Sequence, residues 1–394
     1  MNNAGSVEVG QEVVMKNVGR LPVTFSRGEG SRLWDADGKE YIDFLSGISV
    51  NNFGHCHPDI TAALRDQAGK ILHVSNYFYL EEQIKLAHEL TKLTNYHSVF
   101  FANSGAEANE AAIKLARKYG KTKLGGRYQI ITAKGSFHGR TLGALSATGK
   151  PQYQEDFQPL VPGFAYAEYN SLKSWLGAIT EQTCAVMLEL VQGEGGVYPA
   201  DPDFVEGLAR ICYKYNLLMI VDEVQTGLGR TGKLFAYEHF NMKPDIVTIA
   251  KSLGGGVPCG ALMVNEKADI FTPGDHSTTI GGGAMAYAAG LVTLRLLQEP
   301  GFLDEVLRKG NYIKDTWEYW RREMPVIDGC RGLGLMLALD LKVPSKQVML
   351  ACLEEGLVVN AVSETGIRIL PALNISREDL DEGLAIFKKV LKNL

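Results

Sequence analysis

Uninterrupted apolar stretches alternate along the chain with segments whose apolar residues recur every three or four positions. The apolar stretches are candidate strands at residues 99–103, 128–133, 184–191, 217–223, 245–250 and 260–264. They lack the apolar–polar alternation of a half-exposed strand, so we expect both faces of the sheet to be covered. Strands that alternate with helical segments predict an α/β fold whose large domain has a mostly parallel central sheet.

The two ends of the chain follow a different pattern. After about residue 290, amphipathic helical segments are interspersed with short candidate strands at 335–341, 356–360 and 367–373. Residues 31–44 contain short strand-like pieces with a turn at Asp37-Gly38. We therefore predict a large domain over residues 51–290 and a smaller α+β domain over residues 291–394, with residues 1–50 packing against the smaller one.

Composition excludes several classes of protein. The 394 residues carry a net charge of −5, so no basic field indicates a nucleic-acid or membrane partner. No signal peptide or membrane-spanning run is visible, and none of the six cysteines forms a C-x-x-C pair, which favours a cytoplasmic location. The triplet His55-Cys56-His57 matches no common zinc spacing, so we expect no metal.

Two candidate strands end in residues that need an electrostatic partner. Five apolar residues lead into Asp222 and Glu223, and the strand at 245–250 leads into Lys251. A carboxylate is costly to bury unless something positive or hydrogen-bonding meets it. A desolvated lysine has a lowered pKa and becomes a nucleophile. Because ligands bind beyond the carboxyl ends of strands in such sheets, we expect Asp222 and Lys251 to face one crevice.

A helix is predicted after residue 103, and its start allows two interpretations. The helix would bury one face, made of Ala108, Ala111, Ala112, Leu115 and Ala116. Ser104 and Glu107 have the spacing of a capping box. Alternatively, Ser104, Gly105 and Ala106 leave free N–H groups at a helix N-terminus, which attracts an anion. With this second interpretation, the crevice would suit pyridoxal phosphate: an aldehyde for Lys251, a pyridinium nitrogen for Asp222 and a phosphate for the helix.

Five longer motifs together resemble the class III, or omega-amino-acid, aminotransferases. These motifs are NSGAEANEAAIKLAR, SFHGRTLGALSATG, VQGEGGVYPA, DEVQTGLGRTGKLFAYEHF and PDIVTIAKSLGGGVPCGA. The resemblance runs from about Arg27 to the segment IRILPAL near residue 370. It implies a fold type I transferase that binds pyridoxal phosphate, and a homodimer whose active sites lie at the subunit interface.

The resemblance also implies roles for individual residues. Lys251 resembles the lysine that binds the cofactor's aldehyde, and Asp222 resembles the partner of the pyridinium. The remaining cofactor contacts it implies are Gln225 at the ring hydroxyl, Val224 and Phe137 on the ring faces, Gly105 and Ala106 at the phosphate, and Thr279 from the other subunit. Arg140 resembles the arginine that binds a distal substrate carboxylate, while Glu194 and Arg368 resemble the gate pair of this class.

Such a gate would let one pocket accept two kinds of substrate. An omega donor has no carboxylate on its reacting carbon, so Glu194 would neutralise Arg368. Glutamate has a carboxylate there, so Glu194 would swing aside. The alternative is a static structural ion pair. Lys251, once free of the cofactor, would move the proton between substrate and cofactor, which contributes about 10²–10⁴-fold to the rate.

Within the family, RGEGSRLWDADGKEYIDFLSGISVNNFGHCHP and RGLGLML most resemble the members that act on N-acetylornithine. The implied activity moves the terminal amino group of N-acetylornithine to 2-oxoglutarate, in arginine biosynthesis. Succinylornithine, 4-aminobutyrate or a lysine-pathway substrate remain alternatives, as does, less favoured, an aminomutase on the same fold. Two positions depart from the family: the loop HSTTIGGGA at 276–284, and Val18 where an aromatic residue is common.

Overall fold

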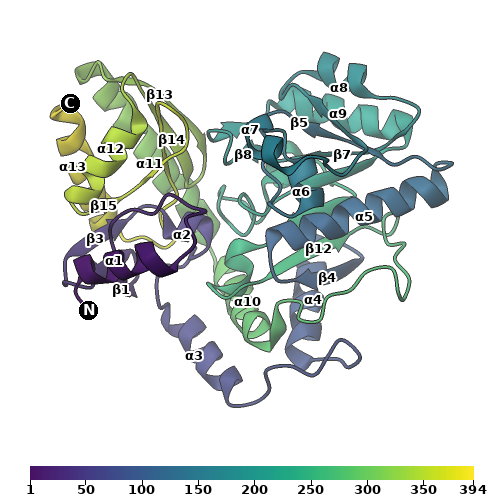
Figure 1. Ribbon diagram of the computed structural model, residues 1–394, viewed down its shortest axis with the longest axis horizontal. Helices are drawn as coiled ribbons and strands as arrows, with labels where there is room; N and C mark the ends of the chain where they lie inside the picture. The colour runs from purple at the N-terminus through teal and green to yellow at the C-terminus, as the bar shows by residue number, and fades with distance from the viewer.

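The computed structural model describes all 394 residues, and its largest element is a seven-stranded sheet (Figure 1). In spatial order the strands are β4 (Ser98–Ala102), β12 (Gly260–Val264), β11 (Ile246–Ile249), β10 (Leu218–Asp222), β7 (Thr183–Leu188), β5 (Gln129–Ala133) and β6 (Phe164–Ala167). All pairs are parallel except the two that β12 makes, which are antiparallel. The prediction of a mostly parallel sheet is confirmed.

The centre of this sheet is covered on both faces. Every residue of β7, β10, β11 and β12 is buried, as their uninterrupted apolar sequences predict. The surrounding helices are α3 (Pro58–Ala68), α4 (Glu81–Thr94), α5 (Gly105–Lys123), α6 (Leu142–Ala147), α7 (Pro151–Gln154), α8 (Leu172–Ala178), α9 (Pro202–Tyr215) and α10 (Gly283–Leu297), with 3₁₀ turns η1 (Glu155–Phe157), η2 (Ala236–Phe240) and η3 (Lys251–Gly254). Helix α5 packs against β7, β11 and β12 through the predicted alanine-rich face.

The order of the strands brings the two polar strand ends together. Strands β10 and β11 are parallel neighbours, with Asp222 opposite Thr248. Asp222 is the last residue of β10, and Lys251 begins η3 two residues beyond the end of β11. The carboxyl ends of parallel strands meet at the same edge of a sheet, so both side chains emerge at that edge.

The two ends of the chain share a second body, on the left of Figure 1. One sheet has the order β1 (Phe25–Glu29), β2 (Arg32–Asp35), β3 (Glu40–Asp43), β15 (Leu357–Val358). Another has the order β13 (Ile327–Leu333), β14 (Met336–Leu341), β17 (Gly366–Ile369), β16 (Asn360–Ala361). The helices here are α1 (Asn3–Val13), α2 (Ser46–Ser49), α11 (Phe302–Glu323), α12 (Ser345–Glu354) and α13 (Arg377–Lys392). The domain limits stay a prediction, and α10 crosses residue 290.

Two candidate strands were predicted as single elements and are wrong in that respect. The stretch 184–191 ends its pairing in the large sheet at Leu188, and β8 (Val191–Gln192) pairs instead with β9 (Tyr198–Pro199). The stretch 356–360 is divided between β15, which pairs with β3, and β16, which pairs with β17. In each case an apolar run continues past the point at which the backbone changes its partner.

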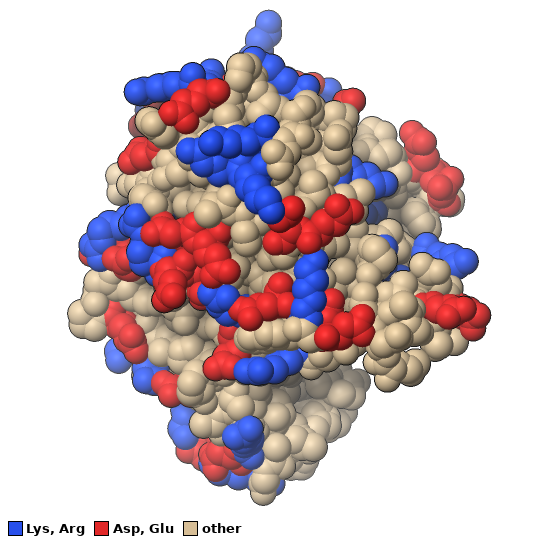
Figure 2. Space-filling model, turned by 90° about the vertical axis from the view of Figure 1, so that its left-hand side faces the viewer, with Lys and Arg blue, Asp and Glu red and all other residues tan.

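Charged side chains of both signs are interspersed over the face that carries the chain ends (Figure 2). Arg32, for example, pairs with Asp379 at 2.6 Å and with Glu382 at 2.6 Å. This mixed surface agrees with the small net charge and presents no continuous basic area on the face in view. Among the helices, none combines the length and the apolar composition that crossing a bilayer requires.

Candidate functional site

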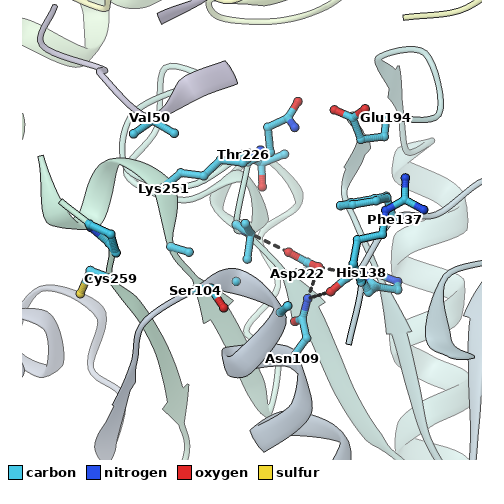
Figure 3. A pocket seen from close by; sticks show the side chains of 18 of the residues that line it. Val50, Ser104, Asn109, Phe137, His138, Glu194, Asp222, Thr226, Lys251 and Cys259 are labelled. Carbon is cyan, nitrogen blue, oxygen red and sulfur yellow. Dashed lines mark hydrogen bonds and ion pairs between the residues drawn. The ribbon is translucent and has the colours of Figure 1, made fainter. Parts of the chain in front are cut away.

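A cavity of about 490 Å³ lies beyond the carboxyl edge of the large sheet. Its walls come from the ends of β10 and β11, the start of α5, and the loops after β5 and β7. All predicted site residues line it except Arg368 and Thr279. In Figure 3, Lys251 and Phe137 approach from opposite sides, and Asp222 lies between them.

Asp222 is held at the floor of the cavity by three hydrogen bonds. Asn109 Nδ2 donates to Oδ2 at 2.8 Å, His138 Nδ1 lies 2.8 Å from the same oxygen, and Val224 N donates to Oδ1 at 3.0 Å. An ionised carboxylate only accepts hydrogen bonds, so His138 Nδ1 carries the proton in that contact. Asp222 is 4 % exposed, and these donors compensate its burial. Its position is therefore fixed before any ligand arrives.

Lys251 is a desolvated lysine at the wall of the same cavity. Burial, followed by the positive charge of Arg368, lowers the pKa of its amine to about 8. Its backbone has a φ of +50°, in the left-handed region that non-glycine residues rarely adopt. Such strain persists where the surrounding structure imposes it, and here it turns the side chain from the strand end into the cavity.

The start of α5 is capped and still has free backbone N–H groups that could bind an anion. Ser104 Oγ accepts from Glu107 N at 3.2 Å, so the predicted cap is present. The Glu107 carboxylate accepts from Asn103 N at 2.6 Å, one residue before the position that a standard capping box uses. The N–H groups of Gly105 and Ala106 remain without an intrahelical acceptor, as the first turn of any helix requires. Gly105 is needed there, because a Cβ would lie 2.7 Å from Val224 Cγ1.

A buried acid, Glu189, joins two segments of the cavity wall. Its Oε2 accepts from Phe137 N at 3.0 Å and its Oε1 accepts from Gly193 N at 3.1 Å. Burial raises the pKa of the Glu189 carboxyl to about 7, although the nearby charge of His138 opposes the rise. Glu189 therefore ties the Phe137 loop to the loop that carries Glu194.

Arg368 lies behind the wall and reaches the cavity through Glu194. Its Nη1 is 2.6 Å from Glu194 Oε1 and also donates to Gln225 Oε1 at 3.2 Å, while Nη2 donates to Asn360 Oδ1 at 2.7 Å. The Arg368 side chain is 1 % exposed and that of Glu194 is 31 % exposed. Burial alone would raise the pKa of Glu194, but the charges of Arg368 and Lys251 outweigh it and lower the pKa.

Arg140 is an exposed cation at the mouth of the cavity. It makes no ion pair with a protein carboxylate, and its Cζ lies 3.8 Å from the centre of the Tyr153 ring and 5.4 Å from that of Phe137. A guanidinium supported by aromatic rings and free of a protein anion is available to a carboxylate from solution.

Thr279 does not line this cavity, although its neighbour Thr278 accepts a hydrogen bond from the cavity residue Asn103 at 3.4 Å. It is exposed, in the loop between β12 and α10. The expectation for this residue concerned a second subunit, and it stays a prediction.

Sequence reasoning missed the residues that support the site. Asn109 and His138 hold Asp222, Glu189 ties two loops together, and Asn360 holds Arg368. Asn109 interrupts the otherwise apolar buried face of α5, and Glu189 interrupts the apolar run at 184–191. Those polar interruptions were the available signal, whereas nothing in the sequence indicates the partner of His138 or of Asn360.

The residues at the cavity fit pyridoxal phosphate. An amine with a lowered pKa, a fixed carboxylate and two free helix N–H groups surround one space, and Phe137 and Val224 line it. His138 Nε2 and Asn109 Oδ1, both buried behind Asp222, have no hydrogen-bond partner. The carboxylate with its donors is suited to a protonated ring nitrogen, and the helix start to a phosphate.

Known proteins are similar to this chain over nearly its whole length. Residues 13–391 match the family described as "Aminotransferase class-III". An acetylornithine aminotransferase from Caldanaerobacter subterraneus is 46 % identical over 386 residues, covering 98 % of each chain. One from Methanocaldococcus jannaschii is 44 % identical over 383 residues, covering 97 % of this chain and 96 % of the relative.

Solved structures agree with this similarity. An ornithine aminotransferase from Toxoplasma gondii has a TM-score of 0.96 at 30 % identity, covering 100 % of this chain and 96 % of the other. An acetylornithine aminotransferase from Elizabethkingia anophelis has a TM-score of 0.90 at 34 % identity, covering 100 % of each chain.

Proposed function

The chain belongs to the class III aminotransferase family and is a pyridoxal-phosphate-dependent enzyme, and from this premise we propose that it moves the terminal amino group of N-acetylornithine to 2-oxoglutarate. The products are N-acetylglutamate semialdehyde and glutamate, which places the reaction in arginine biosynthesis. Relatives at 46 % and 44 % identity that carry the name acetylornithine aminotransferase support this substrate.

At one end of the cavity, the proposal assigns the residues around Lys251 and Asp222 to the cofactor. Pyridoxal phosphate supplies an aldehyde that takes up the amino group and a ring that takes up electrons from the reacting carbon. In this proposal Lys251 binds the aldehyde, and afterwards its free amine moves the proton at the reacting carbon. Asp222 keeps the ring nitrogen protonated. The helix start at Gly105 and Ala106, next to Ser104, receives the phosphate, while Gln225 bonds the ring hydroxyl.

The observation that carries the substrate proposal is that one arginine at the site has a carboxylate partner in the protein and the other has none. Arg368 is paired with Glu194 at 2.6 Å, while Arg140 has no protein anion. N-acetylornithine has one carboxylate, remote from its reacting carbon, and this binds to Arg140. Glutamate has two carboxylates, so it needs Arg140 for the distal one and Arg368 for the other. Glu194, which is partly exposed, leaves Arg368 in that second case.

Free ornithine is the second candidate, because a structure with a TM-score of 0.96 carries that name. The sequence identity to it is 30 %, lower than to the acetylornithine aminotransferases. Succinylornithine and 4-aminobutyrate have the same distal carboxylate and remain chemically compatible. An aminomutase is disfavoured, since it has no second carboxylated substrate for which Arg368 must be freed.

A half-reaction screen tests the proposal. The holoenzyme is mixed with one amine at a time, without an oxo acid, and the absorbance of the bound cofactor reports its conversion to the amino form. N-acetylornithine and glutamate should give the highest kcat/KM, with free ornithine and 4-aminobutyrate as the matched comparisons. Faster conversion by either comparison amine would replace the proposed donor.

We further propose that the enzyme is a cytoplasmic homodimer in which Thr279 of one subunit completes the phosphate site of the other. Support comes from exposed aromatic residues near that loop: Tyr77 is 92 %, Phe78 is 68 % and Tyr79 is 89 % exposed. Exposed aromatic clusters of this kind mark interaction surfaces. Sedimentation should give twice the mass of the chain, and Thr279→Ala should weaken cofactor retention.

A further inference from the structure

A short segment beside the cavity contacts both ends of the substrate site. Helix α7 and the preceding Lys150 form a tight turn, with Tyr153 N donating to Lys150 O at 3.0 Å. The turn is anchored from below by the buried Gln154, whose Nε2 donates to Leu145 O at 3.0 Å and to Thr148 O at 2.7 Å. A turn held in this way keeps its two side chains at a fixed spacing.

Tyr153 is the support of Arg140. The guanidinium carbon lies 3.8 Å above the ring centre, and the Tyr153 ring also meets Phe137 edge-on at 6.4 Å. Arg140 has no hydrogen-bonding or ionic partner in the protein, and of the two rings it contacts, that of Tyr153 is the nearer, at 3.8 Å against 5.4 Å for Phe137. The Tyr153 ring is therefore the main restraint on the direction of this exposed side chain.

Lys150 is the support of Glu194. Its Nζ donates to the backbone oxygen of Glu194 at 2.5 Å. The same Nζ lies 5.4 Å from the centre of the Tyr153 ring. No side-chain carboxylate pairs with this half-buried ammonium, so its direct bond goes to the main chain of the gate residue. Burial lowers the pKa of Lys150, although Glu194 opposes the change.

We propose that Lys150 and Tyr153 act together as a spacer that sets the distance between Arg140 and the Glu194–Arg368 pair, and so the length of substrate that the enzyme accepts. Tyr153 fixes the Arg140 end and Lys150 fixes the Glu194 end, both from one anchored turn. The two are positioning residues, since neither lines the cavity. The inference rests on the proposed role of Arg140 in binding the distal carboxylate.

The Tyr153 end is tested with Tyr153→Leu and Tyr153→Phe, each purified as holoenzyme. Half-reactions are followed from the amino form with 2-oxo dicarboxylic acids that have four, five and six carbon atoms. Loss of an exposed cation–π contact is worth roughly twofold to fivefold, so Tyr153→Leu should raise the apparent Kd for 2-oxoglutarate by about that factor. The maximal rate should stay the same, and the preference for five carbons over six should shrink. Tyr153→Phe keeps the ring face and should restore both values, and Tyr213→Leu, at a residue 91 % exposed, is the surface control.

The Lys150 end is tested with Lys150→Met, and the exposed Lys173→Met is the control. Without its main-chain bond, Glu194 should pair less completely with Arg368. The kcat/KM ratio of N-acetylornithine to glutamate should then fall by about threefold, smaller than one lost charged hydrogen bond because only the position of Glu194 changes. Thermal unfolding and cofactor absorbance, recorded for every variant, separate this effect from loss of folded enzyme.

Arg140→Lys separates a failure of the proposed role of Arg140 from a failure of the spacer. If this variant binds both substrates normally, the proposed role of Arg140 is wrong. If it binds them weakly while Tyr153→Leu keeps wild-type Kd and length preference, the spacer is wrong and the proposed function stands. Equal losses in Tyr153→Leu and Tyr153→Phe would also overturn the spacer, since the ring face would then be irrelevant. Should Tyr153→Leu fail to fold, an unchanged substrate ratio in Lys150→Met overturns it.

Discussion

At the floor of the cavity Asp222 accepts three hydrogen bonds and is 4 % exposed, whereas at the wall Glu194 makes one side-chain ion pair and is 31 % exposed on its side chain. The partners of Asp222 are themselves fixed: Asn109 also donates to His138 O at 2.7 Å. Glu194 has solvent on one side and a loop beneath it.

Under the proposed function, the difference separates a carboxylate that stays in place, Asp222, from one that moves, Glu194. A carboxylate that accepts hydrogen bonds from three fixed donors costs a great deal to displace. One that pairs with a single buried arginine and keeps access to water can leave that arginine when a substrate carboxylate takes its place. The same cavity therefore combines a rigid end suited to a permanent cofactor and an adjustable end suited to two substrates in turn.

The largest effect should come from Lys251→Ala. In the proposed mechanism, removal of the amine takes away both the covalent link to the cofactor and the group that moves the proton, so turnover should fall by more than the roughly 10²–10⁴-fold of a general base alone. Borohydride reduction of the wild-type enzyme followed by peptide mapping should place the pyridoxyl label on Lys251. A label on another lysine would remove this residue from the proposal.

Asp222→Asn should have the next largest effect. The volume is nearly unchanged, but the ring nitrogen loses its charge-assisted partner, and proton transfer should slow by about 10²-fold or more. Stopped-flow absorbance of the half-reaction with glutamate is the measurement. Near-wild-type rates with bound cofactor would mean that Asp222 contributes to folding and not to the reaction.

Glu223→Gln is the matched control in the same chain segment. Glu223 is also buried and does not line the cavity; its Oε1 accepts from Tyr237 N at 2.9 Å, and its Oε2 accepts from the hydroxyl of Thr226. Burial raises the pKa of this carboxyl to about 7. Glutamine keeps an acceptor for Tyr237, so the half-reaction should stay within about threefold while the melting temperature shifts by a few degrees.

Much of the rigid end could be predicted from sequence. Buried parallel strands have continuous apolar sequences, so Asp222 and Lys251 stood out as charges at strand ends, and six of the seven strands of the large sheet were located. The edge strand β6 was missed. Two further errors arose where one apolar run serves two sheets: at 184–191 and at 356–360 the pairing partner changes within the run. Hydrophobicity indicates that a residue is buried but does not indicate which strand pairs with it.

The supporting contacts could not be predicted in the same way. Asn109, His138 and Asp222 come from three separate segments, and Lys150 reaches a main-chain oxygen 44 positions away in the chain. Hydrogen bonds between distant segments depend on side-chain direction, and no periodicity encodes that. The residues at the adjustable end, Arg140, Glu194 and Arg368, were identified only through resemblance to a family. No hydrophobic pattern or residue spacing in the sequence indicates an ion pair that opens and closes.

Glu194→Ala tests the adjustable end. Arg368 would then be free for a carboxylate next to the reacting carbon in every substrate complex, which favours glutamate, and would stay unpaired with an omega donor. A change of about 1.4 kcal/mol corresponds to tenfold in a rate ratio. We expect the kcat/KM ratio of glutamate to N-acetylornithine to rise by about tenfold. If both rates fall equally, Glu194 has a structural role, and the enzyme accepts its two kinds of substrate by some other means.

The smallest effect links the two ends through charge. Burial, with Arg368 as the next cause, lowers the pKa of Lys251 to about 8, and only a neutral amine attacks an aldehyde. The neutral fraction grows about fivefold from pH 7 to pH 8 and then levels off, so the rate at which cofactor-free enzyme rebinds pyridoxal phosphate should follow the same curve. Arg368→Gln removes a cation that disfavours the protonated amine and should move the midpoint to higher pH. Asp222→Asn removes an anion that favours it and should move the midpoint lower. A midpoint near that of an ordinary lysine, unmoved by either change, would show that the two ends act on Lys251 independently of their charges.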